Sequence, residues 1–375
     1  MKIILSVIAV IIVLAIAFVT IVFANEGEDK AVDEYLASQP SPSPSVSPSP
    51  SPSEEPSPSP SVEPAYTGPV NPLTGLPADT EISNNRPFAI MINNIRVAQP
   101  QIGISKADII YEILVEGGIT RMMAVFQDVT GAGEIGSIRS ARPYFVDIAL
   151  GHDALYIHAG GSPDAYSKLA STDIFHLDGV NGRKQDIFFR DPARKATMGS
   201  VHSLVTTDEL ILKHVPTYNV ALEHPSGYTC NMTFSDSAAP AGSIAAQTIT
   251  AHFSSSKTTT FTYSAESGTY DVSQYKAAYI DGNDQSKISV ANVLILHTTI
   301  NVISGDAEGR IDVDVTGSGT GAFFCGGKYE EITWSRKKST DQFSFTLADG
   351  SELVFAKGKT YICIISNNDK IDIKE

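Results

Sequence analysis

Cysteine is scarce in this sequence of 375 residues, and the three cysteines, Cys230, Cys325 and Cys363, all lie in its second half. None belongs to a C-x-x-C pair or stands beside a histidine, which excludes the common thiolate metal sites. Three thiols also allow at most one disulfide within a chain. We therefore expect buried thiols, and the sequence predicts neither a metal site nor a cofactor.

Basic residues are also in deficit. The chain has 27 lysines and arginines against 42 aspartates and glutamates, which gives a net charge of −15. Nucleic-acid-binding proteins carry basic surfaces that neutralise phosphates. The composition therefore excludes nucleic acid as a general partner.

Charged residues are absent from one apolar run, IILSVIAVIIVLAIAFVTIVFA, at residues 3–24. A helix of about 20 apolar residues spans a bilayer, whereas a signal peptide has a shorter apolar region of about 7–15 residues. Residues 1–24 are predicted as a transmembrane signal-anchor. Lys2 precedes the run and an acidic stretch follows it, so the remainder is expected outside the cell membrane. The alternative is cleavage after Ala24, which would release a secreted protein.

Residues 25–67 are first acidic and then dominated by serine and proline, with the repeat SPSPSVSPSPSPSEEPSPSPSVEP. Such a sequence is too polar to bury a core, and its prolines favour an extended chain of about 3.1 Å per residue. We expect a disordered tether that acts as a spacer. A ligand for a proline-recognising domain and a glycosylated stalk remain alternatives.

The rest of the chain is longer than one typical domain, and its texture changes along its length. Residues 68–222 alternate apolar runs with helix-like segments, which predicts an α/β or α+β domain. Residues 244–375 contain short β-prone runs between Gly, Asp and Asn, which predicts a mainly antiparallel β domain. Residues 223–243, with two prolines and two glycines, are the predicted hinge.

Several elements follow from the apolar pattern and from helix-start residues. Helices are expected from residues 105–114, from Pro143 and from Ser162 and Pro163. Strands are expected at residues 86–92, 121–126, 154–158, 257–263, 291–297 and 361–365.

Arg139 and Arg142 stand just before Pro143, which is favoured at the first position of a helix. Two cations at the positive end of a helix are unfavourable unless an anion neutralises them. The pair therefore indicates an anion-binding site. The alternative is a buried pair in which Asp147 or another carboxylate accepts both arginines.

A second candidate cluster is HAGGSPD at residues 158–164, where a strand is expected to turn into a helix. Gly160 and Gly161 permit a tight turn, and Ser162 suits the cap of the next helix. Such a turn offers backbone N–H groups to an anion. His158 and Asp164 are the candidate acid–base residues if the protein is an enzyme, although His158 also suits a hydrogen-bonded core position.

A third cluster, between Asp178 and Ser203, is rich in arginine and lysine with interleaved aspartates. It indicates either a local anion-facing surface or a solvated network of ion pairs. No Gly-x-Ser-x-Gly motif supports a serine hydrolase.

The chain resembles the YerB-like family of bacterial envelope lipoproteins, a domain of unknown function with an associated C-terminal domain. The matching motifs are NPLTGLP (71–77), RP (86–87), SKAD (105–108), YE (111–112), EGGITR (116–121), RSARPY (139–144), HAGGS (158–162), ANV (291–293), TGSG (316–319) and Trp334. The resemblance implies a two-domain cell-surface protein and no known reaction. The chain departs from the family in lacking a lipidated cysteine and in the segment TMGSVHS (197–203), so no role is assigned to His202.

Two classes of function follow. The first is a binding module in which Arg139, Arg142, Gly160, Gly161 and Ser162 hold an anionic envelope ligand, a glycan or a phosphate-bearing polymer. The second is a hydrolase or transferase on envelope glycan, with His158 or Asp164 as acid or base. A structural partner of envelope proteins is a third possibility. Binding is the favoured prediction because no nucleophile–base pair or metal set is legible.

Overall fold

The computed structural model describes residues 66–182, 186–236, 240 and 244–375. The predicted membrane segment and nearly all of the tether lie outside these residues. Within the described part of the chain, no helix is long and apolar enough to cross a membrane. The contacts group Ala65–Glu375 into one compact unit.

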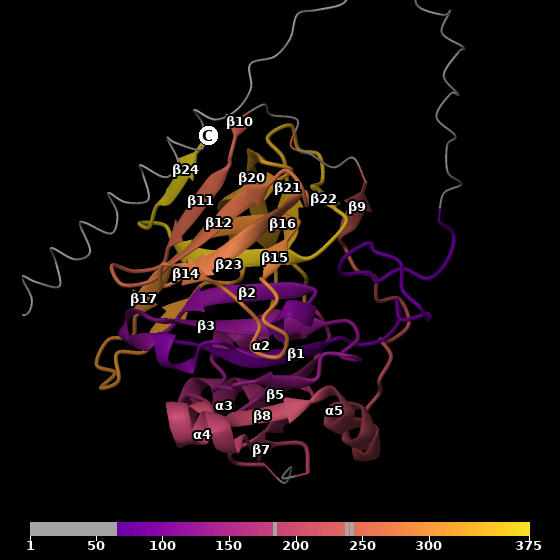
Figure 1. The fold of residues 1–375 in the computed structure, drawn as a ribbon, viewed down its shortest axis with the longest axis vertical. Helices are drawn as coiled ribbons and strands as arrows, with labels where there is room; N and C mark the ends of the chain where they lie inside the picture. Colours follow the sequence, from indigo (N-terminus) through magenta and orange to yellow (C-terminus); the bar gives the residue numbers. More distant parts are fainter. Residues whose placement is uncertain (1–65, 183–185, 237–239, 241–243) are drawn as a thin grey trace, which may run out of the picture. The chain divides into compact units, whose positions relative to one another are not determined.

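A single large sheet runs through both halves of the described chain (Figure 1). Strand β23 of the C-terminal half pairs in parallel with β2 of the N-terminal half, so the halves predicted as separate domains share this sheet. In spatial order its strands are β10 (Ile244–Ala245), β20 (Lys328–Arg336), β19 (Gly317–Cys325), β16 (Asn292–Thr298), β23 (Thr360–Ser366), β2 (Ile109–Leu114), β3 (Thr120–Phe126), β1 (Phe88–Asn94), β5 (Leu155–His158) and β6 (His176–Asp178), with β21 (Ser344–Thr346) beside β20.

The central strands of this sheet are buried on both faces. Every residue of β1 and β3 is buried, and Ile90 and Met91 of β1 face two different core clusters. The sequences of strands that are covered on both faces are continuous apolar runs, without the alternation of apolar and polar residues that a half-exposed strand has. This explains why the prediction of a helix at residues 105–114 is wrong: the segment forms a short 3-10 turn, Ile104–Lys106, and then β2. Its isoleucines favour a strand, and periodicity alone did not distinguish the two.

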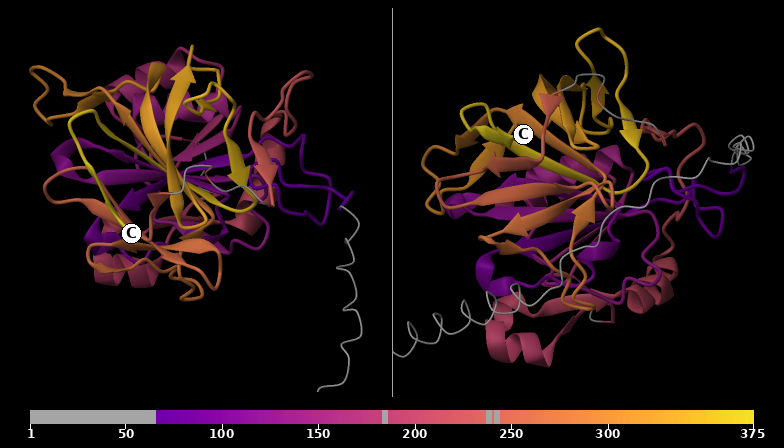
Figure 2. Two further views of the ribbon diagram at one scale, coloured as in Figure 1. Left: turned by 90° about the horizontal axis from the view of Figure 1, so that it is seen from above. Right: turned by 45° about the horizontal axis from the view of Figure 1, so that its top comes forward.

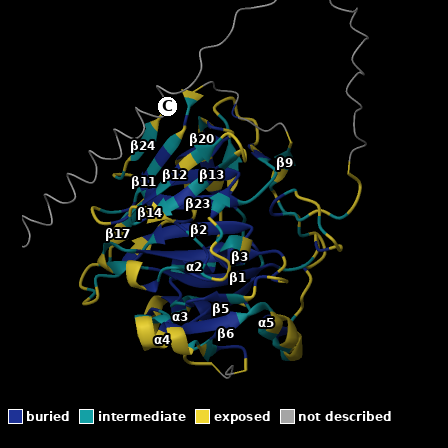
Figure 3. Cartoon of the chain, viewed as in Figure 1, coloured by how far each residue is buried: buried dark blue, intermediate teal, exposed yellow. Residues whose placement is uncertain are grey.

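Helices α2 (Pro143–Gly151) and α3 (Pro163–Ala170) begin where the sequence predicts. Both have proline at their start, and the hydroxyl of Ser162 accepts a hydrogen bond from the N–H of Ala165 at 3.2 Å. Their apolar side chains join one face of the large sheet. Two further helices are α4 (Pro192–Met198) and α5 (Asp208–His214), whose surfaces are largely exposed (Figure 3).

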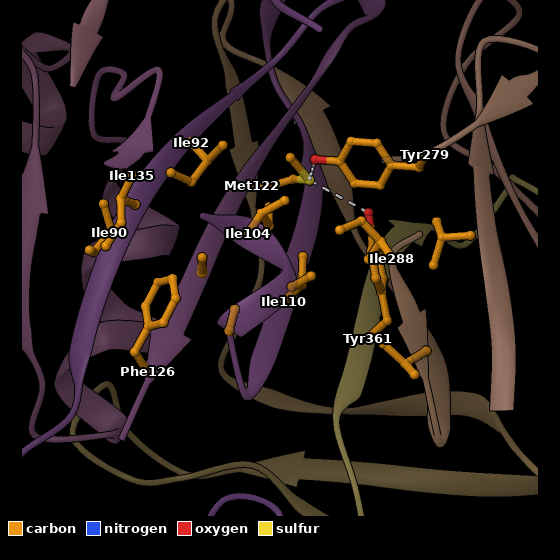
Figure 4. Packing of buried hydrophobic residues seen from close by; sticks show 14 of the residues in the cluster. Ile90, Ile92, Ile104, Ile110, Met122, Phe126, Ile135, Tyr279, Ile288 and Tyr361 are labelled. Atoms are coloured by element: carbon orange, nitrogen blue, oxygen red, sulfur yellow. Dashed lines mark hydrogen bonds between the residues drawn. The ribbon is translucent and has the colours of Figure 1, made fainter. Parts of the chain in front are cut away.

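A second, antiparallel sheet belongs to the C-terminal half, and Figure 2 gives two further views of it. Its inner residues Ile249, Phe261 and Tyr270 share a core cluster with the large sheet. Figure 4 shows this packing, in which the sulfur of Met122 accepts hydrogen bonds from the hydroxyls of Tyr279 at 3.8 Å and Tyr361 at 3.6 Å. The strands are β14 (Ala277–Ala278), β13 (Thr269–Gln274), β12 (Thr258–Ser264), β11 (Thr248–His252) and β24 (Ile371–Lys374), with β15 (Ser289–Val290) beside β13.

Three small sheets complete the described fold. They are β4 (Glu134–Gly136) with β8 (Leu204–Thr207) and β7 (Phe189–Arg190), β17 (Ile300–Val302) with β18 (Ile311–Val313), and β9 (Thr233–Ser235) with β22 (Val354–Ala356). Strand β9 lies in the segment predicted as the hinge, and its pairing ties that segment to the C-terminal half. The predicted fold class, mixed α/β followed by mainly antiparallel β, is confirmed for the described residues.

Candidate functional site

A recess of about 390 Å³ lies at the carboxyl ends of the parallel strands β5 and β6. The loops that follow parallel strands meet at this edge of a sheet, which is where α/β proteins commonly bind ligands. The residues that line it come from the loops after β5 and β6, from the chain before α2 and from the segment around β7 and β8. They are Ile138, Arg139, Ser140, Ala159, Gly160, Gly161, Tyr166, Val180, Asn181, Arg190, Ser200, Val201 and Leu204.

Arg139 is the predicted site residue that faces this recess. Its backbone is fixed between β1 and β5, because its N–H donates to the carbonyl of Met91 at 2.9 Å and its carbonyl accepts from Ala159 at 3.0 Å. The Nη1 group donates to the carbonyl of Val201 at 3.2 Å, and Nε has no partner among the described residues. Burial and the neighbouring Arg142 lower the pKa of Arg139. This unpaired Nε atom is itself inaccessible to solvent.

The glycine turn lines the recess, but its first N–H group is already bound. Gly160, with φ of 74°, donates its N–H to Oδ1 of Asp178 at 2.7 Å. The same carboxylate accepts from the N–H of Val180 at 2.8 Å and from the hydroxyl of Tyr166 at 2.7 Å. Although burial raises the pKa of Asp178, these hydrogen bonds lower it below its usual value. An internal carboxylate thus occupies the anion position that the turn was predicted to offer.

Arg142 does not line the recess, contrary to the prediction. It caps α2 and is buried, and its Nε and Nη2 groups both donate to the carboxylate of Glu116, Nε at 3.0 Å. The alternative of a buried pair is thereby confirmed for Arg142, with Glu116 as acceptor. Asp147 instead pairs with Lys168 at 3.0 Å. Ser162 also lies outside the recess, since its hydroxyl caps α3.

Arg121 joins Arg142 and Arg139 around the single carboxylate of Glu116. Its Nη1 donates to the carbonyl of Ser140 at 2.9 Å, and its Nη2 lies 3.9 Å from Glu116. Burial and the charge of Arg142 lower the pKa of Arg121 to about 9. Burial raises the pKa of Glu116, but its contacts with Arg142 outweigh this effect and lower it overall. The cluster has more positive than negative charge.

The two candidate acid–base residues, His158 and Asp164, lie in different surroundings. His158 is buried, and its Nδ1 lies 2.8 Å from the carbonyl oxygen of Gly160 while its Nε2 lies 3.0 Å from Nδ1 of His176. Burial lowers the pKa of His158. Asp164 is exposed and lines a different recess with Lys168 and Asp147. The two side chains therefore do not face one pocket, because α3 turns Asp164 away from the end of β5.

The side chains of the third, basic cluster contact different parts of the protein. Arg190 lines the recess and donates to the carbonyl of Ser200, whereas Arg194 donates to the carbonyls of Ala98 and Pro100, both at 2.9 Å. Nδ1 of His202 lies 2.8 Å from the amide nitrogen of Asn93. Arg183 and Lys184 lie outside the described residues.

Comparison with known families assigns both halves of the chain. Residues 73–220 match the family model described as "Protein of unknown function (DUF3048) N-terminal domain", and residues 249–362 match the C-terminal domain of the same family. The chain belongs to the DUF3048 family. This agrees with the YerB-like resemblance of its motifs.

Two comparisons place this DUF3048 protein beside YerB of Bacillus subtilis. The chain is 29% identical to "Putative lipoprotein YerB" over 307 residues, which cover 81% of this chain and 88% of that protein. The crystal structure of YerB superposes with a TM-score of 0.70 at 28% identity, covering 82% of this chain and 99% of that one. The fold is therefore shared along nearly the whole described part of the DUF3048 chain.

A fully buried ion pair between the two halves escaped the sequence reasoning. Nζ of Lys257 lies 3.0 Å from Oε1 of Glu112, and both side chains are almost completely inaccessible. Oε2 of Glu112 accepts from the hydroxyls of Thr259 at 2.7 Å and Tyr361 at 2.6 Å. The available signal was a lone carboxylate inside the apolar run IIYEIL, because a buried charge requires a partner.

No group of three or more His, Cys, Asp or Glu residues that suits a metal ion occurs in the part of the chain that the structure describes. Burial raises the pKa of the Cys230, Cys325 and Cys363 thiols. Arg139 and Arg190 are the charged side chains that line the recess.

Proposed function

We propose that this DUF3048 protein binds an anionic cell-envelope ligand, a glycan or a phosphate-bearing polymer, in the recess beside Arg139. The observation that carries this proposal is that Arg139 lines an open recess, while the buried Nε of its guanidinium group has no partner among the described residues. Arg190 adds a second cation to the same lining. Arginine donors form charge-assisted hydrogen bonds with carboxylates and phosphates, and a recess of this size holds a small ligand or one unit of a polymer.

The proposed setting is the outer face of the cell membrane. The name of the relative from Bacillus subtilis describes that protein as a lipoprotein, which is an anchored envelope protein. In this chain the apolar run at residues 3–24 would replace the lipid as a single-pass anchor, since no cysteine lies near the end of the run. The serine- and proline-rich residues would then separate the binding unit from the membrane surface.

Binding has more support than the other two classes of function. A hydrolase or transferase needs an acid–base group that reaches its substrate, whereas His158 is hydrogen-bonded inside the protein and Asp164 faces another recess. If the role of the protein were purely structural, Arg139 would be expected to form a buried ion pair with a carboxylate. Arg139 instead lines an open volume, and its Nη1 group donates to the carbonyl of Val201 and not to a carboxylate.

The test measures binding of the full-length chain, in detergent, to purified anionic envelope polymers. Arg139→Gln is expected to weaken binding about tenfold or more, because a hydrogen bond to a charged group is lost. Raising the salt from about 0.15 M to about 1 M is expected to weaken wild-type binding. The matched control is Arg96→Gln, which removes the charge of an exposed arginine outside the recess. Equal loss in both variants would refute the proposal.

A further inference from the structure

The carboxylate of Glu116 covers two arginines that lie deeper than it does. The side chains of Arg121 and Arg142 are 5% and 8% exposed, whereas that of Glu116 is 26% exposed. Glu116 belongs to the 3-10 turn Glu116–Gly118 between β2 and β3. The Glu116 carboxylate therefore contacts the arginines from the solvent side and shields them from solvent.

The charges in this cluster are unbalanced. Arg121, Arg139 and Arg142 influence one another, and Glu116 is the carboxylate that acts on both Arg121 and Arg139. Buried charges are stable only when paired and hydrogen-bonded. The cluster therefore carries excess positive charge. Such a cluster is suited to bind a further anion, or to bind a ligand carboxylate in place of the carboxylate of Glu116.

Unused donors surround the same cluster. The hydroxyl of Tyr156 is completely buried and has no hydrogen-bond partner among the described residues. Arg121 and Arg142 are the charged groups that act on it most strongly. Buried hydroxyl groups are normally hydrogen-bonded, so the Tyr156 hydroxyl is an unused donor on which both guanidinium groups act electrostatically.

Glu116 is able to leave this position without rebuilding the turn. The base of the turn is held, because the N–H of Val115 donates to Ile119 at 2.8 Å and the carbonyl of Gly118 accepts from the hydroxyl of Ser254 at 2.6 Å. Its tip is open, since a side chain at Gly117 would meet no atom within 4 Å. A rotation of the Glu116 side chain toward solvent is therefore sufficient to uncover the arginines.

We propose that Glu116 is an internal competitor that occupies the position of a ligand carboxylate on Arg121 and Arg142. This inference rests on the proposed anion-binding function and specifies its ligand class, with the ligand carboxylate placed on the two arginines next to Arg139 and outside the recess that Arg139 lines. Glu116 meets Arg142 through two donors, Nε and Nη2, and a planar carboxylate of a ligand reproduces that bidentate pairing. The carboxylate comes from a sugar acid or from a peptide.

The test is calorimetric titration of the full-length chain and its Glu116→Gln variant with D-glucuronate, alanyl-alanine and inorganic phosphate. Removing the competing charge is expected to tighten binding of a carboxylate about tenfold, the value of a charged hydrogen bond. The better of the two carboxylates identifies its source. Phosphate that binds the variant as tightly as either carboxylate would overturn the ligand class.

Asp153→Asn is the matched control. Asp153 also pairs with an arginine, Arg86 at 3.3 Å, and the exposures of that pair, 30% and 11%, resemble those of Glu116 and Arg142. Asp153 has φ of 48°, a conformation that asparagine tolerates. The control is expected to bind the three probes as the wild type does, and an equal gain in the control would overturn the proposal.

Glu116→Asp keeps the test decisive if the glutamine variant fails to fold. The shorter side chain retains the charge but reaches Arg142 less well, so its carboxylate affinity is expected to rise above that of the wild type. If both variants bind the carboxylates no better than the wild type while Arg139→Gln still weakens polymer binding, the competitor is refuted and the proposed function stands. If Arg139→Gln leaves polymer binding unchanged, the proposed function itself is refuted.

Discussion

Strand β2 connects two charged clusters that differ in how completely they are satisfied. Within the strand, Glu112 accepts five hydrogen bonds or ion-pair contacts and is inaccessible to solvent. Just beyond the strand, Glu116 is the carboxylate that acts on Arg142, Arg121 and Arg139. Its side chain is partly exposed, and polar atoms of Arg139 and Tyr156 have no hydrogen-bond partner among the described residues. A saturated, closed network contributes to folding, whereas an unsaturated and partly open one is suited to a ligand.

The two clusters also show how the halves of the protein depend on each other. Lys257 and the loop before it come from the C-terminal half, where Lys257 pairs with Glu112 and Ser254 holds the carbonyl of Gly118. The C-terminal half therefore fixes both the strand and the turn that carries Glu116. Contacts from the β-rich half thus hold a strand and a turn of the N-terminal half in place.

The largest expected effect is on the closed cluster. Glu112→Gln should lower the free energy of unfolding by about 3–5 kcal/mol, because it leaves the charge of Lys257 buried without a partner. Urea unfolding of the full-length chain measures this loss. The double variant Glu112→Gln with Lys257→Met should recover part of the stability. A loss below about 1 kcal/mol for the single variant would mean that solvent reaches this pair.

A smaller loss is expected at the open cluster. Arg142→Met should lower the free energy of unfolding by about 1–3 kcal/mol, since the pair with Glu116 is lost but the partly exposed carboxylate is able to turn toward water. The same urea experiment applies. A loss as large as that of Glu112→Gln would show that the two clusters are equally closed, and the contrast between them would disappear.

The pH dependence should separate the open cluster from the rest of the protein. The pKa of Glu116 is lowered in the folded state, so its pairing contributes stability above its unfolded pKa of about 4.3 and loses that contribution as the pH falls through the lower folded value. The stability difference between wild type and Glu116→Gln should therefore be greatest near pH 6 and shrink toward pH 3. A difference that stays constant over this range would contradict the pairing.

The smallest effect is expected at Asp164, which lies on the surface of α3 and outside the Arg139 recess. Asp164→Asn should change the free energy of unfolding by no more than about 0.5 kcal/mol. Binding of anionic envelope polymers should be unchanged within error. A marked loss of binding would move the ligand toward the recess that Asp164 lines.

Local sequence signals predicted much of the fold. Pro143 and Pro163 marked the starts of α2 and α3, and Ser162 was correctly expected as a cap, because these effects act within one helical turn. The strand at residues 109–114 was missed because a strand buried on both faces has no alternation to read. The recess was predicted in part: Arg139, Gly160 and Gly161 line it, whereas Arg142 and Ser162 have other partners.

The composition and order of the residues were sufficient to predict the mixed α/β texture of the first half, the β-rich texture of the second and the acidic character of the chain. These properties depend on neighbours along the chain. Pairing of charges depends on folding, which brings Lys257 to Glu112 across strands distant in sequence and sets Asp178 against the Gly160 turn. A charged side chain is stable in the interior only where it contacts an oppositely charged or hydrogen-bonding partner. Only the three-dimensional packing therefore distinguishes a buried ion pair from a charged cluster that is partly exposed to solvent.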